Sequence, residues 1–326
     1  LAGYSNIYMG QAGGSFTTIA DPSLTWETSY TSNVALEFGL FNQRLFGSVE
    51  YFNRDSRDLL LDVPLSGVTG FGSTLKNVGE INNHGIELEL GADIINNGKV
   101  RWSASANASW ITSKVTALYK NAGEVKGQDI IWNDPTGGDA RAQFIYREGQ
   151  STLSLYGYEW AGVDPANGKN RWYVNDPADK TTGNFQLNGR GASYDWRDAN
   201  YTIIGSTLPK VAGGFSTDVE YKGISLGLNF IYKIGGNLYD GAFKDVADDG
   251  YYWERIRSKY YYDNMWTPTN TTGTLPRLDG NDLEDPQQFS SRQMHDASFT
   301  RLKNVTLAYN LPKTMLNKIG FASTRV

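Results

Sequence analysis

The chain has 326 residues, a net charge of −5 and no cysteine. Its length allows one large or two smaller domains, and the mild, scattered charge gives no indication of nucleic acid as a partner. The lack of cysteine excludes disulfides, thiolate catalysis and thiolate metal sites. An aromatic content of 13%, 36 glycines and spacers rich in Asn, Ser and Thr are typical of an all-β protein.

The first predicted elements are two pairs of strands joined by tight turns. Residues 34–40 alternate apolar and polar side chains, "NQR" turns the chain, and residues 45–51 alternate again. The next pair covers 86–94 and 100–110, with Asn97-Gly98 as a strong hairpin dipeptide between them. Both pairs therefore predict antiparallel hairpins.

Five further strand segments follow. Residues 153–163 and 171–175 flank "DPANGKN", although their alternation is weaker. Residues 215–221 turn at Lys222-Gly223 into 224–232, and residues 298–309 lead into a turn around Leu311-Pro312. We expect about ten strands, in one partial barrel domain that spans residues 1–326.

The connections between the pairs are long, at roughly 55–83, 112–150, 176–212 and 234–296. Structureless loops of this length are unusual in a compact soluble domain. Short turns on one rim and long loops on the other are typical of an antiparallel transmembrane β-barrel, with periplasmic turns and extracellular loops. No apolar run has the length of a membrane helix, and this is compatible with such a barrel.

The stretch "KVRWSASANASWI" at 99–111 alternates strictly. Trp102 and Trp110 close a thin stripe of alanines, and their spacing of about 26 Å along a strand matches a lipid-facing band between two aromatic girdles. The opposite side would face a watery lumen. Its predicted lumen-facing residues, with those of the preceding strand, are Glu87, Glu89, Arg101, Ser103, Ser105 and Asn107. A sandwich strand with two edge tryptophans would give the same local pattern.

Signals of an enzyme are weak. His84 and His295 fit rim or loop positions better than a catalytic base, and no nucleophile elbow is present. A carboxylate pair such as Glu87 and Glu89 could serve a glycosidase, but lumen-facing polar residues explain it more simply. We therefore expect no enzymatic activity and no cofactor.

One acidic loop could bind a metal ion. "DGNDLEDP" clusters oxygen ligands suited to Ca²⁺, but it lacks the spacing of a helix-loop-helix calcium site. A solvated acidic loop is the simpler interpretation. The four candidate ligands are Asp279, Asp282, Glu284 and Asp285.

The strongest candidate for a binding surface is "DDGYYWERIRSKYYYDNMW" at 248–266. Tyr and Trp give a large contact area at low entropic cost and suit a sugar, a peptide or a partner protein. The spacing of Tyr252, Ile256 and Tyr260 also suits a short helix packed on neighbouring loops. The candidate residues are Tyr251, Tyr252, Trp253, Arg255, Arg257, Tyr260, Tyr261 and Trp266.

Six segments between residues 22 and 313 resemble, in the same order, the barrel segments of the SusC/RagA family of TonB-dependent outer-membrane transporters. The first three are "PSLTWETSYTSNVALEFGLFNQRLFGSVEYFNRDSRDLL", "GFGSTLKNVGEINNHGIELEL" and "YREGQSTLSLYGYEWAGVDPANGK". The others are "IGSTLPKVAGGFSTDVEYKGISL", "MWTPTN" and "DASFTRLKNVTLAYNLPK". Departures are minor, such as Ala35 where the family pattern has Gly.

The resemblance implies import of an oligomeric nutrient, a glycan or a peptide, through the outer membrane of a Bacteroidetes-type bacterium. It implies a SusD-like surface lipoprotein as a lid, TonB as the source of energy, and outer-membrane lipid around the barrel. The family's plug domain, TonB box and last strands are not in this sequence. We therefore expect the chain to be a piece of a 22-stranded barrel that other parts of the molecule close.

Two alternatives remain open at this stage. A secreted soluble β protein that binds or cleaves carbohydrate would need a filled core and short loops at both ends. A passive porin would share the barrel but need neither a plug nor TonB.

Overall fold

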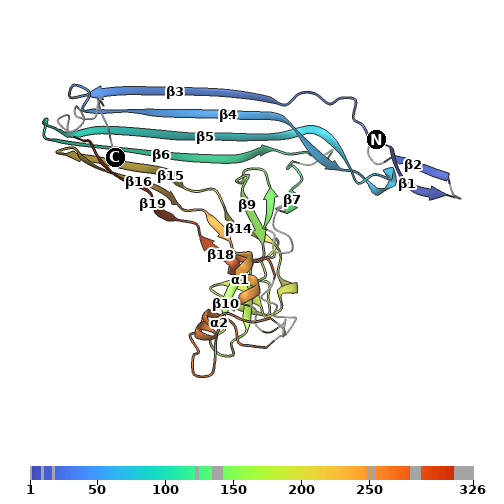
Figure 1. Ribbon diagram of the computed structural model, residues 1–326. Helices are drawn as coiled ribbons and strands as arrows, with labels where there is room; N and C mark the ends of the chain where they lie inside the picture. The colour runs from blue at the N-terminus through green and yellow to red at the C-terminus, as the bar shows by residue number, and fades with distance from the viewer. Residues whose placement is uncertain are drawn as a thin grey trace.

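The computed structural model describes residues 2–8, 11–16, 19–121, 125–133, 142–247, 250, 255–279 and 288–311. Its largest element is a seven-stranded antiparallel sheet with the order β19-β16-β15-β6-β5-β4-β3 (Figure 1). The strands are β3 (Thr28–Leu40), β4 (Leu45–Pro64), β5 (Ser73–Asn96), β6 (Val100–Ala117), β15 (Val211–Tyr221), β16 (Ile224–Ile234) and β19 (Phe299–Tyr309).

Tight turns join the strands at one end of this sheet. Asn97 accepts hydrogen bonds through its side chain from Lys99 and Val100, and Gly98 has a φ of +77°. Lys222 and Gly223 both have positive φ, as the two central residues of a type I′ turn require. The predicted hairpins at 34–51, 86–110 and 215–232 are thereby confirmed.

The predicted long connection at 55–83 is wrong. β4 and β5 continue through most of it and stay paired as far as Pro64 and Ser73. Only residues 65–72 connect them, and these contain the short 3-10 helix η1 (Gly67–Thr69). A bulge between Ser56 and Leu59 shifts the register, so the simple alternation of the sequence breaks although pairing continues.

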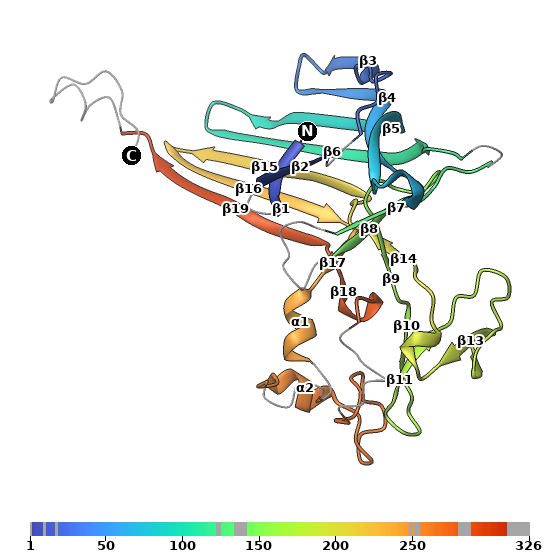
Figure 2. The ribbon, with the colours of Figure 1, turned by 90° about the vertical axis from the view of Figure 1, so that its right-hand side faces the viewer.

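The other long connections carry secondary structure of their own, and we call the described residues of 118–210 and 235–298 the loop assembly. Figure 2 shows its helices and small sheets gathered beyond one end of the long strands. One four-stranded sheet has the order β14-β9-β8-β7 and another β10-β11-β13-β12. Their strands are β7 (Ile130–Asn133), β8 (Gln143–Tyr146), β9 (Ser154–Gly157), β10 (Trp160–Val163), β11 (Asn170–Tyr173), β12 (Phe185–Leu187), β13 (Arg190–Ser193) and β14 (Thr202–Ser206).

The remaining elements are short. β17 (Asn237–Tyr239) pairs with β18 (Met294–Asp296), and β1 (Ala2–Tyr8) pairs with β2 (Gln11–Phe16). The helices are η3 (Trp196–Asp198), α1 (Gly241–Val246), α2 (Lys259–Asn264) and η5 (Ser291–Gln293). Within the described residues, no helix combines the length and apolarity needed to cross a membrane.

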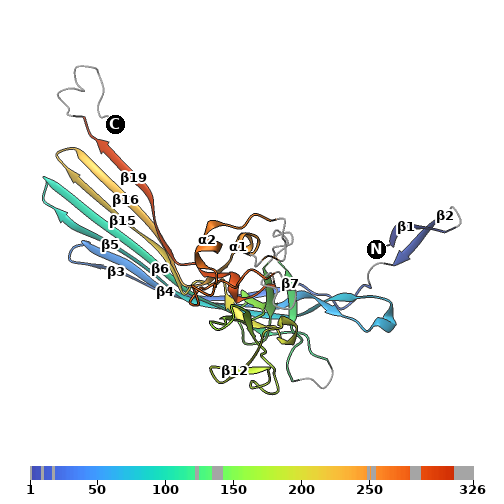
Figure 3. The ribbon, with the colours of Figure 1, turned by 90° about the horizontal axis from the view of Figure 1, so that it is seen from below.

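The strand pair predicted around "DPANGKN" belongs to the loop assembly. β10 pairs with β11 across that turn, but neither strand joins the long sheet. The long sheet therefore holds seven of the described strands, rather than the ten or so counted from the sequence. Figure 3 shows its strands fanning away from the loop assembly.

Burial divides the molecule into two regions. Along β3 and β19 almost every side chain is exposed, whereas Trp172, Ile145, Leu155 and Tyr261 of the loop assembly are fully buried. A separate apolar cluster gathers Ala247, Tyr261 and Leu275, with Phe243 and Met265 packed against it. Most of the buried apolar side chains therefore lie in the loop assembly, although Val63 of β4 and Val115 of β6 are also buried.

Candidate functional site

Cross-strand pairing assigns each side chain of the long sheet to one of two faces. Glu89 pairs with Asn107 and Glu87 with Ser109, so these side chains share one face, which we call the polar face. Arg101, Ser103 and Ser105 alternate with the apolar residues of β6 and belong to the same face. Further polar residues on it are Glu37, Ser48, Glu50, Ser216, Asp218 and Asn229.

The polar face differs between its two halves. Carboxylates dominate on β3 to β5, where Asn33 donates to Glu50 Oε1 at 3.0 Å and Ser109 donates to Glu87 Oε1 at 3.2 Å. Hydroxyls and amides replace them on β6 and β15, where Ser105 Oγ lies 2.8 Å from Ser216 Oγ. Polar side chains run along the length of this face, and large apolar residues are interspersed among them, including Phe46, Phe52, Ile111 and Ile231.

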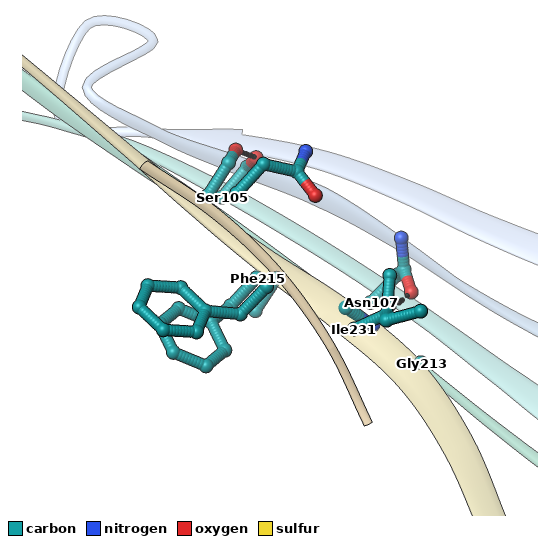
Figure 4. A pocket seen from close by; sticks show the side chains of 10 residues that line it. Ser105, Asn107, Gly213, Phe215 and Ile231 are labelled. Atoms are coloured by element: carbon teal, nitrogen blue, oxygen red, sulfur yellow. Dashed lines mark hydrogen bonds between the residues drawn. The ribbon is translucent and has the colours of Figure 1, made fainter. Parts of the chain in front are cut away.

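A shallow hollow crosses β6, β15 and β16 near the middle of the sheet. Figure 4 shows Ser105 and Asn107 on one side of these strands and Phe215 on the other. Glycine is required beside Asn107, because a Cβ at Gly213 would lie 2.1 Å from the Asn107 carbonyl oxygen. Asn107 Oδ1 also accepts a hydrogen bond from the backbone N–H of Gly214 at 2.8 Å.

The opposite face is apolar and exposed, and we call it the apolar face. Val34 is 74% exposed and Leu307 is 72% exposed, values that a soluble protein does not sustain over a contiguous sheet. Trp102 and Trp110 lie on this face, and Trp102 Nε1 donates to Thr217 Oγ1 at 2.9 Å. Other aromatic side chains of this face lie level with the two tryptophans: Tyr51 is aligned with Trp110 through Ile86, and Tyr221 and Tyr309 lie near Trp102.

The aromatic loop predicted from the sequence is only partly a surface. Tyr251, Tyr252 and Trp253 lie outside the described residues. Tyr261 is fully buried, and its hydroxyl donates to the Pro276 carbonyl at 2.7 Å.

Trp266 also has a packing role. It lies against Gly168, whose φ of +75° and lack of a side chain admit the indole ring, and its Nε1 donates to the Pro165 carbonyl at 2.9 Å. The buried tyrosine and this tryptophan therefore hold loops together.

Tyr260 remains accessible at 55% exposure, 6.2 Å from the ring of Phe243. Arg255 pairs with Asp245 at 2.5 Å, and Arg257 donates to the Arg255 carbonyl. The helix considered for this segment begins later than the sequence spacing indicates. α2 starts at Lys259, so Ile256 lies ahead of it and is 93% exposed.

The histidines and the acidic loop form no metal-binding group in the described residues. His84 Nδ1 lies 2.7 Å from Asn82 Oδ1, and His295 lies 3.8 Å from Asp240. Asp279 pairs with Arg277, whereas Asp282, Glu284 and Asp285 lie outside the described residues. Across the part of the chain that the structure describes, no three His, Asp or Glu side chains form a metal-binding group.

The loop assembly contains an aromatic cluster that was not predicted from the sequence. The Tyr158 ring lies 4.3 Å from Tyr201 and 5.5 Å from Trp196, and Tyr156 meets Tyr201 at 5.5 Å. Burial, followed by the neighbouring Tyr201, raises the pKa of Tyr158 to about 12. The sequence feature that could have indicated this cluster is the period-two spacing in "YGYEW", which places Tyr156 and Tyr158 on one face of a strand.

An ion pair ties β13 of the loop assembly to the residue that precedes β10. Arg190 donates to both carboxylate oxygens of Glu159, at 2.8 and 2.6 Å, and lies 3.8 Å from the centre of the Tyr173 ring. Hydrogen bonding to Arg190 lowers the pKa of the Glu159 carboxyl below its ordinary value. Residues 31 positions apart make this pair, so no local sequence pattern could have indicated it.

A family model for the TonB-dependent receptor-like β-barrel matches residues 1–131. TonB-dependent receptor P3 of Formosa agariphila is 30% identical over 100% of the chain and 32% of its own length. TonB-dependent receptor SusC of Bacteroides thetaiotaomicron is 25% identical, over 91% of the chain and 27% of its own length. The chain therefore spans about a third of these relatives.

Two solved structures of a transporter are also similar to this chain over its whole length. The RagAB peptide transporter matches with a TM-score of 0.78 and 29% identity, covering 100% of the chain and 33% of that transporter chain. The RagAB peptide importer in its "open-open" state matches with a TM-score of 0.77 and 29% identity, again over 100% and 33%.

Proposed function

Because the chain belongs to the TonB-dependent receptors of the SusC/RagA type, we propose that it forms part of the wall of an active importer. That importer lies in the outer membrane of a Bacteroidetes-type bacterium. The observation that carries the proposal is the sheet with one exposed apolar face, one polar face and all its folded loops at one end.

The apolar face fits the hydrocarbon layer of a membrane. The stretch of β6 from Trp102 to Trp110, both included, is nine residues long, and a tilted transmembrane strand needs about 9–11. Alanines 104, 106 and 108 between them suit a surface covered by lipid tails, which fill space without interlocking side chains. Trp and Tyr rings at both ends of the stretch fit the two interfaces, where an apolar ring with one polar atom is best solvated.

The polar face fits the lumen of the barrel. Its Glu, Ser and Asn side chains would face water, the plug domain and the passing substrate. No side chain of this face is assigned a chemical step, because the family consists of transporters rather than enzymes. The proposed activity is therefore binding followed by gated passage.

The loop assembly fits the extracellular mouth. In this proposal a SusD-like lipoprotein covers it, and TonB supplies the energy through a plug domain. Relatives described as SusC and as the RagAB peptide transporter support this partnership and an oligomeric substrate, a glycan or a peptide. The aromatic loop around Tyr260 would take part in partner or substrate contact.

The test is purification of the full-length protein from native outer membranes in mild detergent without heating. Mass spectrometry would identify co-purified proteins and any bound oligosaccharide or oligopeptide. Recovery with an equal amount of a surface lipoprotein supports the importer, and the bound ligand gives its substrate class. Recovery in the soluble or secreted fraction with no such lipoprotein would refute it.

A further inference from the structure

The apolar face changes character abruptly toward the loop end, and strand pairing locates the change. One cross-strand row on this face is apolar and aromatic, and its side chains are 43–74% exposed. It consists of Val34, Tyr51, Ile86 and Trp110, each paired with the next. In the proposed membrane orientation, this row marks the outer edge of the hydrocarbon layer.

The next two rows on the same face are polar. The first consists of Ser32, Asn53, His84 and Thr112. The second consists of Tyr30, Asp55, Asn82 and Lys114. Rows on one face are two residues apart, about 7 Å along the strands. The change from apolar to charged is therefore complete within about 14 Å, before the strands end.

A hydrogen-bond network engages the only carboxylate of these rows. Asn82 Nδ2 donates to Asp55 Oδ1 at 2.6 Å and to Asn53 Oδ1 at 2.7 Å. Asn53 in turn donates to Asp55 Oδ2 at 3.2 Å. Asn82 Oδ1 can only accept, so His84 carries a proton on Nδ1 in this contact. The acidic charge is thus held within the sheet surface by neighbouring amides.

Two cationic side chains remain at the surface. Lys114 ends the second polar row, and its side chain is exposed. Arg57 follows one step beyond Asp55 on the same face, and its guanidinium lies 5.3 Å from the centre of the Tyr30 ring. This cation–π contact holds the Arg57 side chain against the sheet while its residue stays exposed.

We propose that these two polar rows, with Arg57, dock the phosphorylated sugar headgroups of glycolipids in the outer leaflet of the membrane. The inference rests on the proposed function, which places the apolar face in the membrane. Guanidinium and ammonium groups form charge-assisted hydrogen bonds to phosphate. The hydroxyls and amides of Ser32, Asn53 and Thr112 suit sugar hydroxyls.

A lipid is the occupant because the surface continues the lipid-facing sheet without a break. Headgroup layers add about 5–7 Å on each side of the hydrocarbon core, which matches one to two rows beyond Trp110. A protein partner at this position would have to displace lipid from the row below. The docked lipid would form an annulus beneath the extracellular loops.

The test uses the full-length protein in nanodiscs, with the lipid A fraction of the host's outer membrane as the probe. Retained lipid A is counted by native mass spectrometry for the wild type, Arg57→Gln, Lys114→Gln and the double variant. A basic residue near an anionic surface contributes about 1 kcal/mol, so each single change should weaken retention about fivefold and the pair roughly thirtyfold.

Arg54→Gln is the matched control. Arg54 lies three residues from Arg57 but on the polar face, where its Nε donates to Thr31 Oγ1 at 3.3 Å, so its loss should leave retention unchanged. Lipid A stripped of its phosphates should bind all variants equally and weakly.

Equal retention of phosphorylated lipid A by the wild type and the double variant would overturn the proposal. So would loss of retention in Arg54→Gln to the same extent. Either result leaves the proposed function standing, as long as the protein is recovered from the outer membrane with its lipoprotein. Recovery of the protein in the soluble fraction is a separate outcome, which would refute both the proposed function and the lipid-docking proposal.

Discussion

The long sheet and the loop assembly of this chain are stabilised in opposite ways. In the sheet, backbone ladders run unbroken through up to 13 consecutive paired residues, while large apolar side chains such as Val34 stay exposed. In the loop assembly, strands of three to five residues surround fully buried side chains such as Trp172 and Tyr261. One region relies on hydrogen-bonded pairing and an external apolar medium, and the other on an internal core.

This difference separates two consequences of a mutation. A change on the apolar face acts through the membrane, because only lipid contacts that face in the proposed orientation. A change in the loop assembly acts through packing and can open the loops while the sheet stays paired. The predictions below use pairs of matched residues to separate the two effects.

The largest effect is expected for Trp172→Ala. This residue lies on β11, which pairs with β10 and β13, and its side chain is fully buried; removal of a buried tryptophan costs about 3–5 kcal/mol. Hydrogen exchange of the purified full-length protein should rise across β9 to β14 and stay unchanged in β3 to β6. Trp102→Ala, on a side chain that is 37% exposed, is the control and should leave the loop assembly protected. Equal exchange in both variants would contradict the division into two regions.

The second effect concerns the membrane itself. Ala106→Arg places a charge in the middle of the apolar face and should destabilise the folded protein in lipid by about 2–4 kcal/mol. Ser105→Arg, one residue away on the polar face, should cost less than about 1 kcal/mol. Urea titration in lipid vesicles, followed by the heat-dependent shift of the folded band on gels, measures both. Similar costs for the two variants would show that lipid does not cover the apolar face.

A smaller effect is expected for Tyr261→Phe. It removes the hydroxyl that donates to the buried Pro276 carbonyl, at a cost of about 1–2 kcal/mol. Proteolysis of the loop assembly should become several-fold faster. Tyr260→Phe changes an exposed neighbour and should leave the rate as it is. If Tyr260→Phe accelerated cleavage equally, a buried hydrogen bond could not be the reason.

The smallest effect is a dependence on pH. The pKa of Glu159 is lowered in the folded state by its hydrogen bonds to Arg190. The contribution of the Glu159 carboxylate to the free energy of unfolding is therefore fully present above its ordinary pKa of 4.5. This contribution is lost as the pH falls from 4.5 through the lowered pKa of the folded state. Protection of β10 to β13 should decline in that window in the wild type. Glu159→Gln should be less protected at neutral pH and should lack this part of the decline.

The alternation of the sequence was a reliable guide wherever one face of a strand is apolar and the other polar. Residues 34–40, 86–94 and 100–110 show it, and they form β3, β5 and β6. It failed past Ser56, where β4 bulges and the consecutive residues Leu59, Leu60 and Leu61 place apolar side chains on both faces. The hydrogen bonds of the backbone continue there without any signal in side-chain polarity.

Among the candidate binding residues, the sequence predicted the position of some correctly and could not predict the burial of others. The sequence placed Glu87, Glu89 and Asn107 on the face opposite Trp102 and Trp110, because a period of two fixes the side of every residue within a strand. It offered Tyr260 and Tyr261 alike as binding residues. Only the packed structure distinguishes them, since a helix of six residues turns Tyr261 into a core that Leu275 completes.

The sequence by itself therefore determined the strand faces and the tight turns, because these depend on residues near one another in the chain, and six ordered segments of it carried the resemblance to a family. Tertiary structure alone decided which strands share the long sheet, how residues from β3 to β6 align into rows, and which aromatic side chains are buried. Each of these depends on contacts between distant segments, such as Asp55 with Asn82 or Glu159 with Arg190. The register between strands aligns the alternating residues of each strand with those of its neighbours, and this alignment forms the rows of the proposed lipid-binding surface.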